Sequence, residues 1–225
     1  MLLIAMGTAI ASIISIVGSY FDRYGNRVHY IGKLWSRVNL FLSGVSVEVR
    51  GIEHIKKGQP YIVMSNHQSY YDVWALIAYL PLQLRWVMKL ELREIPIFGL
   101  GCERVGHIYI DRSDSEKSHK SLEVAGEKIR AGASVVFFPE GTRSPDSSML
   151  PFKKGGFVIA LAAGVPILPI TVIGGRNILR KGSMRILPGK MQIIIHEPIS
   201  IEGYTRETKE ELMAKVRVVI EKDLR

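Results

Sequence analysis

A histidine and an aspartate stand five positions apart in this chain, and their types and spacing are suited to general-base chemistry. His67 follows the apolar run 61–64, and Asp72 precedes a predicted helix over 73–80. The imidazole therefore lies at the carboxyl end of a predicted strand, where ligands bind in α/β sheets. A folded-back turn would bring the Asp72 carboxylate to one ring nitrogen and leave the other nitrogen free to take a proton. The alternative is that His67 caps the helix and Asp72 is an acid in its first turn, favoured by the helix dipole.

Two more predicted strands end in arginine-containing segments. Asp111 and Arg112 close the predicted strand 106–112, and Arg143 follows the strand 134–138. If these ends meet the end that carries His67, one crevice holds a base and two guanidiniums. A guanidinium presents a planar set of donors that matches phosphate oxygens. The alternative for each arginine is a surface ion pair with the acid near it in sequence.

Four other polar or small residues are candidates for the same crevice. Gly141 would let the backbone approach a ligand closely, and Thr142 lies beside it. Glu140 is expected to orient one of the arginines or to accept a hydrogen bond from a substrate hydroxyl. Lys89 follows the predicted strand 84–88 and could point into the crevice, although a solvated lysine is the ordinary alternative.

The absence of other motifs narrows the chemistry. The chain has no phosphate-binding Gly-rich loop, no Gly-x-Ser-x-Gly segment and no set of zinc ligands, and its single cysteine, Cys102, excludes an intrachain disulfide. No metal or other cofactor is expected. A base without a nucleophile of its own suggests that a substrate hydroxyl attacks an acyl carbonyl delivered by a carrier.

The charge balance indicates an anionic partner. The formal net charge is +9, and no nucleic-acid recognition motif accompanies it. We therefore expect a phosphorylated substrate or an anionic membrane surface, and no nucleic acid.

The order of elements predicts an α/β fold with a largely parallel sheet flanked by helices. A chain of 225 residues suffices for one such domain and an appendage. Pro166 and Pro169 lie within one predicted strand, which should therefore be an edge strand or irregular. The predicted strands are 45–49, 61–64, 84–88, 106–112, 134–138, 165–172, 184–187 and 192–196, and the predicted helices are 73–80, 115–131, 157–163 and 205–223.

The amino-terminal segment predicts membrane association. Residues 1–21 contain no charged side chain and, as a helix, would reach about 30 Å, the thickness of a bilayer core. A basic amphipathic helix over 27–42 would follow and lie at the lipid interface, in contact with anionic lipid. The lysines and arginines after the first helix favour a cell-membrane location with the following domain on the cytoplasmic side.

Several arrangements of this segment remain open. The first helix crosses the bilayer, or the two helices form a hairpin in one leaflet, or both cover an apolar face of a soluble domain. A cleaved signal peptide is not expected, because no basic residue precedes the apolar run. With Gly44 as the boundary, residues 1–44 form the anchor and residues 45–225 the catalytic domain.

Four segments resemble the motifs of the glycerophospholipid acyltransferases, most closely the bacterial lysophosphatidic acid acyltransferases. They occur in the order of that family and cover roughly residues 45–172. The segments are Asn66-His67-Gln68-Ser69-Tyr70-Tyr71-Asp72, the stretch Gly106 to Arg112, Phe138-Pro139-Glu140-Gly141-Thr142-Arg143-Ser144, and Val165-Pro166-Ile167-Leu168-Pro169-Ile170.

The resemblance implies a reaction and a role for each motif. His67, supported by Asp72, would deprotonate the free hydroxyl of lysophosphatidic acid, which attacks the thioester of acyl-CoA or acyl-carrier protein. Arg112 and Arg143 would hold the acceptor phosphate, and the fourth motif would line the tunnel for the acyl donor. Glu140, Gly141 and Thr142 would shape the phosphate site, with Lys89 as a further ligand. The alternatives are transfer to another lysolipid or to glycerol 3-phosphate, and a non-catalytic protein that binds anionic lipid.

Overall fold

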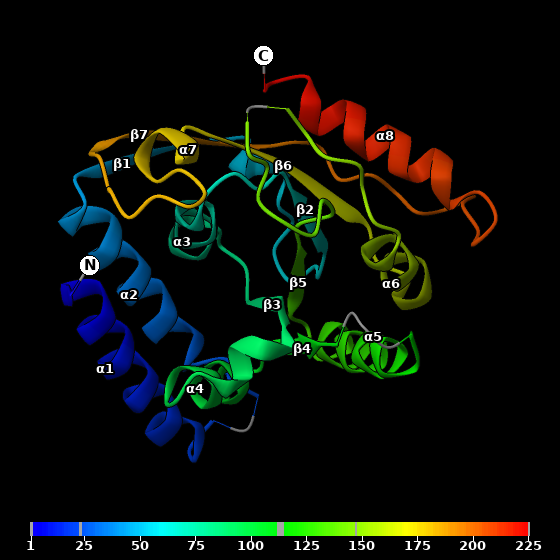
Figure 1. Cartoon of the computed structure of the whole chain (residues 1–225). Helices are drawn as coiled ribbons and strands as arrows, with labels where there is room; N and C mark the ends of the chain where they lie inside the picture. Colours follow the sequence, from blue (N-terminus) through cyan, green and yellow to red (C-terminus); the bar gives the residue numbers. More distant parts are fainter. Residues whose placement is uncertain (1, 23, 112–114, 147, 225) are drawn as a thin grey trace.

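The computed structural model describes residues 2–22, 24–111, 115–146 and 148–224. Within these ranges the strands form one seven-stranded sheet in the order β1-β7-β6-β2-β5-β3-β4, and helices cover both faces (Figure 1). Every neighbouring pair is parallel except β6 with β7. The predicted α/β class is therefore confirmed. The strands are β1 Val45–Arg50, β2 Ile62–Ser65, β3 Leu84–Lys89, β4 Ile108–Ile110, β5 Ser134–Phe137, β6 Ile167–Ile173 and β7 Gly189–Ile195.

Two hydrophobic cores form on the two faces of the sheet. The helices are α1 Leu2–Ser19, α2 His29–Leu42, α3 Tyr70–Tyr79, α4 Phe98–Val105, α5 Ser115–Arg130, α6 Gly155–Ala163, α7 Gly175–Ile178 and α8 Lys209–Glu221, with 3₁₀ turns at Ile52–His54 and Leu90–Glu94. On β2, Val63 packs into the core under α2, α3 and α7, while Ile62 and Met64 pack into the core under α5, α6 and α8. Because both faces of β2 are covered, its sequence is continuously apolar rather than alternating.

The strand predicted over 165–172 to be an edge strand or irregular is the irregular alternative, an interior strand whose pairing is interrupted on one side. β6 lies between β7 and β2. Pro169 pairs with Met64 of β2 on one side, while on the other side the ladder to β7 begins only at Ile170. Before that point the pairing is the isolated bridge between Ile167 and Ile199. Pro169 therefore occupies an interruption of the ladder, where a missing N–H leaves no strand partner unpaired.

Other boundaries also differ from the predictions. Residues 184–187 are not a strand; the backbone N–H of Leu187 instead donates to the carbonyl of Ile178 in α7. The strand predicted over 106–112 is limited to Ile108–Ile110, and α4 and α7 were not predicted.

The two amino-terminal helices pack against the sheet domain. At the contact of α1 with α4, a Cβ on Gly101 would lie 2.8 Å from Cβ of Ser12, so the two helices approach closely. On α2, Trp35 packs edge-on against Trp74 of α3 at 5.5 Å. The outer side of α1 exposes large apolar side chains, and by length and composition α1 could cross a membrane. α1 and α2 lie side by side in Figure 1.

A buried arginine fixes the connection between α1 and α2 to the sheet. Arg85 in β3 is 1% exposed and donates from Nη2 to the carbonyl of Tyr24 at 2.9 Å and to Oδ1 of Asn26 at 3.0 Å. Burial lowers the pKa of Arg85 to about 10, which leaves the guanidinium charged at neutral pH. The position of the amino-terminal helices is thus determined by contacts with β3.

Two neutral histidines near Arg85 should make the fold sensitive to acid. Burial, with the positive charge of Arg85, lowers the pKa of His29 to about 4 and that of His107 to about 3. Between about pH 6.5 and 4 the unfolded chain binds protons at these positions that the folded chain does not bind, so stability falls as the pH falls through this window. We expect His29→Gln to reduce the slope of unfolding free energy against pH by about one proton. Denaturant unfolding at pH 7, 6 and 5 measures this slope. An unchanged slope in the variant would show that His29 does not cause the acid sensitivity.

Candidate active site

The bend from β2 into α3 is encoded by a capping box. The hydroxyl of Ser69 accepts from the N–H of Tyr71 at 3.3 Å, and Oδ2 of Asp72 accepts from the N–H groups of Gln68 and Ser69 at 2.7 and 2.8 Å. These bonds satisfy donors at the start of α3 that have no partner within the helix. Ser69, rather than His67, therefore caps α3. Asp72 lies in the first turn of this helix, as the alternative interpretation predicted.

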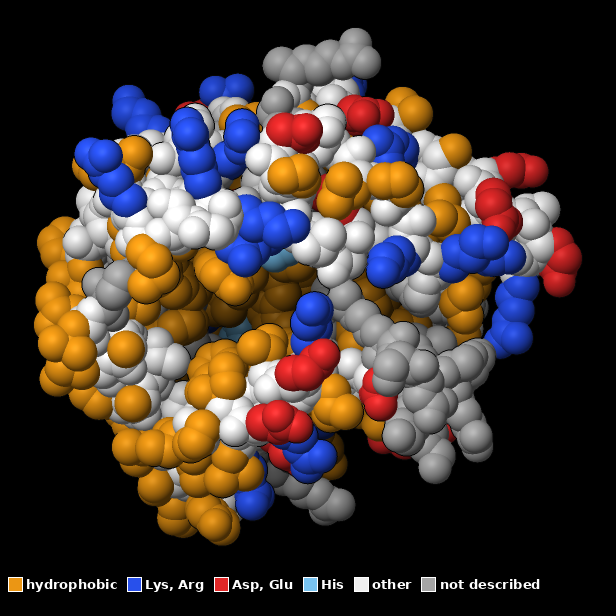
Figure 2. Space-filling model, in the orientation of Figure 1, with side chains coloured by type: hydrophobic (Ala, Val, Ile, Leu, Met, Phe, Trp, Pro, Cys, Tyr) orange, Lys and Arg blue, Asp and Glu red, His pale blue; other side chains and the backbone are white. Residues whose placement is uncertain are grey.

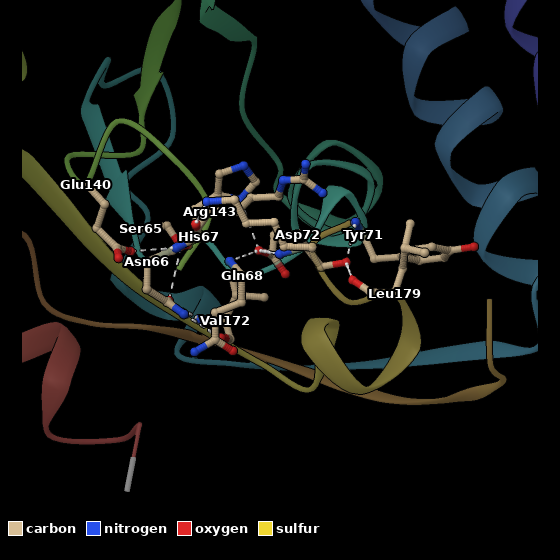
Figure 3. Close-up of polar contacts among 12 residues, drawn as sticks. Ser65, Asn66, His67, Gln68, Tyr71, Asp72, Glu140, Arg143, Val172 and Leu179 are labelled. Atoms are coloured by element: carbon tan, nitrogen blue, oxygen red, sulfur yellow. Dashed lines mark hydrogen bonds and ion pairs between the residues drawn. The ribbon is translucent and has the colours of Figure 1, made fainter. Parts of the chain in front are cut away.

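The same carboxylate also contacts the imidazole of His67. Nδ1 of His67 lies 3.1 Å from Oδ2 of Asp72, which is 1% exposed (Figure 3). The imidazole stacks on Phe138 with a centroid separation of 3.8 Å and an interplanar angle of 7°. No residue in the described ranges hydrogen-bonds to Nε2 of His67. With Nδ1 donating to the carboxylate, Nε2 carries the lone pair that a base requires.

Asn66 extends the pairing of β2 with β6 beyond the end of the strand. Its side-chain amide donates to the carbonyl of Val172 and accepts from the N–H of the same residue, both at 2.8 Å. A side chain thereby replaces a strand partner at a buried position. This holds the backbone that carries His67 against the carboxyl end of β6.

Glu140 has partners other than the expected ones. Its Oε1 accepts from the N–H of His67 at 2.9 Å and its Oε2 from the N–H of Leu150 at 2.8 Å. Among the described residues Glu140 is therefore not paired with Arg143, one of the two arginines it was expected to orient. Burial raises the pKa of Glu140, and the two hydrogen bonds oppose that shift. Its carboxylate ties the segment after β5 to the backbone of His67.

Replacing this carboxylate by an amide should destabilise the fold. In Glu140→Gln the amide nitrogen must face one of the two N–H groups, so one buried donor loses its acceptor. The cost of such an unpaired group is about 1–3 kcal/mol. Urea unfolding at pH 7 measures it. Glu202→Gln, at an exposed position, is the control and should leave the midpoint unchanged; equal midpoints for both variants would contradict the role of Glu140.

Arg143 lies at the same edge of the sheet as His67, and Figure 3 shows the two residues close together. Its guanidinium lies 3.9 Å from the ring centroid of Tyr70. Lys181 donates to the Arg143 carbonyl at 2.8 Å, and the next residue, Ser144, donates its N–H to the carbonyl of His67 at 2.8 Å. The convergence of the β2 and β5 ends follows from their parallel pairing. No carboxylate among the described residues forms an ion pair with Arg143.

The other predicted site residues are less closely engaged with His67. Gly141 has φ +73° and donates its N–H to the carbonyl of Phe138, so it forms the turn after β5. Thr142 is exposed and accepts from Lys181 at 3.4 Å. Lys89 is exposed at the carboxyl end of β3. Arg112 lies outside the described residues.

Sequence reasoning did not assign roles to Phe138, Tyr70 or Asn66. The aromatic residues lie two positions from assigned polar residues in the motifs, but only the fold shows which side chains they face. Asn66 belongs to the first motif, but its strand-like pairing depends on Val172, which is 106 positions away. Across the part of the chain that the structure describes, no three His, Cys, Asp or Glu side chains gather as metal ligands.

A cavity lies where α1, α2 and α4 meet β3. Its volume is about 70 Å³, and its lining includes Ser12 of α1, Gly32 of α2, Gly101 of α4 and Trp86 of β3. Trp86 packs against Phe138 at 5.5 Å, and Phe138 in turn stacks on the His67 ring. Figure 2 shows this side of the molecule hollowed at its centre, with hydrophobic side chains inside and lysines or arginines along the upper rim.

Comparison with known proteins identifies relatives over most of the chain. The acyltransferase family model matches residues 46–173. The 1-acyl-sn-glycerol-3-phosphate acyltransferase of Pseudomonas aeruginosa is 34% identical over 182 residues, which are 79% of this chain and 70% of that protein. The chloroplastic protein BAT2 of Brassica napus, with the same enzyme name, is 37% identical over 80% of this chain and 52% of its own length. The chain thus aligns with about half the length of the plant relative.

One solved structure matches nearly the whole chain. The crystal structure of the 1-acyl-sn-glycerophosphate acyltransferase PlsC from Thermotoga maritima superposes with a TM-score of 0.80 and 28% sequence identity. The superposition covers 99% of this chain and 94% of that one, and therefore includes the amino-terminal helices.

Proposed function

Because the chain belongs to the acyltransferase family, we propose that it transfers a fatty acyl group from an acyl thioester to the free hydroxyl of lysophosphatidic acid, giving phosphatidic acid for phospholipid synthesis. The observation that carries this proposal is the imidazole of His67, which Asp72 holds at the edge of the sheet where the segment with Arg143 also lies. A base and a phosphate ligand at one site match an acceptor that carries a hydroxyl and a phosphate. The names of the relatives support the same acceptor.

In the proposed reaction, Nε2 of His67 removes the proton from the acceptor hydroxyl. The acceptor oxygen then attacks the thioester carbonyl, and the tetrahedral intermediate collapses with cleavage of the carbon–sulfur bond. The proton held by His67 passes to the leaving sulfur, which departs as the thiol of CoA or of the carrier protein. Asp72 keeps Nδ1 protonated and stabilises the imidazolium that exists between the two proton transfers.

The phosphate of the acceptor is assigned to Arg143 together with Arg112. The stacking of Arg143 on Tyr70 supports this role, because an aromatic face holds a guanidinium in place without occupying its N–H donors. Gly141 and Thr142 form the adjacent turn, and Lys89 is proposed as a more distant phosphate ligand. Glu140 contributes by holding the backbone of His67.

We assign the acyl chain to the apolar cavity rather than to the fourth motif. The β6 residues of that motif, Ile167 to Ile170, are buried between β2 and β7. The cavity, in contrast, has a largely apolar surface, and Trp86 in its lining packs against Phe138. A fatty acyl chain is larger than the volume of about 70 Å³, so the cavity would have to widen to hold it.

We further propose that residues 1–44 anchor residues 45–225 to the cell membrane, with the sheet domain on the cytoplasmic side. The exposed apolar surface of α1 supports the anchor. Arg27 and Arg37 are exposed and can meet anionic lipid, whereas the Lys33 ammonium donates to the carbonyl of Leu80 at 2.8 Å and so points toward the protein.

An acceptor panel tests the proposed function. The purified full chain is supplied with one acyl-CoA, or with the acyl-carrier protein that bears the same chain, and with lysophosphatidic acid, glycerol 3-phosphate or lysophosphatidylcholine. We expect turnover to be fastest with lysophosphatidic acid. Equal turnover with lysophosphatidylcholine would contradict a site for a phosphate monoester. Binding to anionic vesicles without turnover of any acceptor would favour the non-catalytic alternative.

A further inference from the structure

Gly175 lies beside the catalytic pair although it is 103 positions away from Asp72 in the sequence. β6 runs parallel to β2, so α7, which begins at Gly175, starts at the same edge of the sheet as α3. The two helices are joined by a hydrogen bond from the hydroxyl of Ser69 to the carbonyl of Leu179 at 2.8 Å. The backbone of Gly175 therefore closes the space behind the Asp72 carboxylate.

The two oxygens of Asp72 have different surroundings. Oδ2 receives Nδ1 of His67 and the N–H groups of Gln68 and Ser69. Oδ1 is buried, forms no hydrogen bond to any residue in the described ranges, and faces Gly175. A Cβ on Gly175 would overlap Oδ1 and would lie 3.3 Å from Cγ of Asp72 and 3.1 Å from Cβ of Ser69. Three hydrogen bonds hold Oδ2, so the carboxylate cannot turn away from such a Cβ without losing some of them.

The backbone conformation of Gly175 does not itself require glycine. Gly175 is helical, whereas its neighbour Gly174 has φ +92°, a conformation that favours glycine whatever its surroundings. The requirement for glycine at position 175 therefore comes from the close approach of the Asp72 carboxylate.

We propose that Gly175 is a positioning residue for the catalytic pair. Its missing side chain creates the space in which Asp72 can hold Nδ1 of His67, and α7 thereby sets the orientation of the base. The inference rests on the proposed function, since it assigns Gly175 a role in the same proton transfer.

The first test is the steady-state kinetics of Gly175→Ala. We expect kcat with lysophosphatidic acid and acyl-CoA to fall about 100-fold, because a displacement of about 1 Å in the supporting carboxylate has effects of that size. The KM for the acceptor should stay near its original value, since Arg143 is untouched. Gly155→Ala is the matched control: Gly155 is also the first residue of a helix, has open space at its Cβ position, and should keep the original kcat.

The second test separates this role from general damage to α7. If Gly175→Ala acts by crowding Asp72, it should lower the Tm by about 5 °C in the original chain and by much less when Asp72 is alanine. Gly174→Ala is the comparison, because its Cβ would overlap the carbonyl of Lys190 and not Asp72. Its loss of Tm should be the same in both backgrounds. If Gly175→Ala alone does not fold, the double variant with Asp72→Ala should still fold.

The outcomes distinguish this inference from the proposed function. Full kcat in Gly175→Ala, or equal Tm losses in the two backgrounds, would overturn the role of Gly175. If His67→Ala keeps its activity, the proposed base is wrong whatever Gly175 does. Loss of activity in His67→Ala with full activity in Gly175→Ala would leave the proposed function intact and reject only the inference.

Discussion

Replacing His67 by alanine is expected to lower kcat about 10³-fold, which lies within the range that general-base catalysis contributes. The variant removes the lone pair at Nε2, and no other base described in the structure has the contacts of His67 with Asp72 and Phe138. The acceptor must then lose its proton to water. Initial rates of thiol release with lysophosphatidic acid and acyl-CoA measure the effect.

A second histidine provides the control for this experiment. His54 follows β1, and its Nδ1 donates a hydrogen bond to the carbonyl of Ile195 at 2.8 Å. β1 is parallel to β7, and β7 is antiparallel to β6, so the end of β1 lies at the opposite edge of the sheet from His67. His54→Ala should therefore retain most of the activity. An unreduced kcat in His67→Ala, or an equal loss in both variants, would reject His67 as the base.

The contact of His67 with Asp72 could be predicted because it is local. Ser69 and Asp72 form a capping box within one turn, and this box brings the carboxylate back to the residues before the helix. The meeting of His67 with Arg143 required one further assumption, that two parallel strands are neighbours, which β2 and β5 satisfy. Short-range spacing and the common edge of a parallel sheet were therefore enough for the centre of the site.

The errors arose where a side chain's partner depends on distant packing. Glu140 was expected to orient an arginine or to accept a hydrogen bond from a substrate hydroxyl, yet the fold presents it with two backbone N–H groups. The prolines indicated an edge strand or an irregular one, and only the fold shows that β6 is the second kind, an interior strand whose ladder to β7 is interrupted at Pro169. The contact of Gly175 with Asp72 also depends on distant packing. It brings together residues that follow two different strands, and no hydrogen bond or charge in the sequence signals it.

Arg143→Ala is expected to raise the KM for lysophosphatidic acid about 10- to 100-fold with a smaller change in kcat. The physical reason is the loss of charge-assisted hydrogen bonds to the phosphate, each with a contribution of about 1.5–3 kcal/mol. Arg143→Lys should recover only part of this loss, because an ammonium keeps the charge but cannot present two parallel donors or stack in the same way on Tyr70. Rates measured over a range of acceptor concentrations give both parameters.

An acceptor without a phosphate tests whether Arg143 acts by binding the phosphate. Monoacylglycerol offers a hydroxyl to His67 but no phosphate to Arg143, so its slow turnover should be nearly the same in the original chain and in Arg143→Ala. Arg50→Ala is the control for loss of an exposed arginine, because Arg50 ends β1 at the opposite edge of the sheet and pairs with Glu48. If Arg143→Ala reduced turnover of both acceptors by the same factor, Arg143 would act by holding the turn beside His67. The phosphate would then have to be bound by other cations at this edge of the sheet.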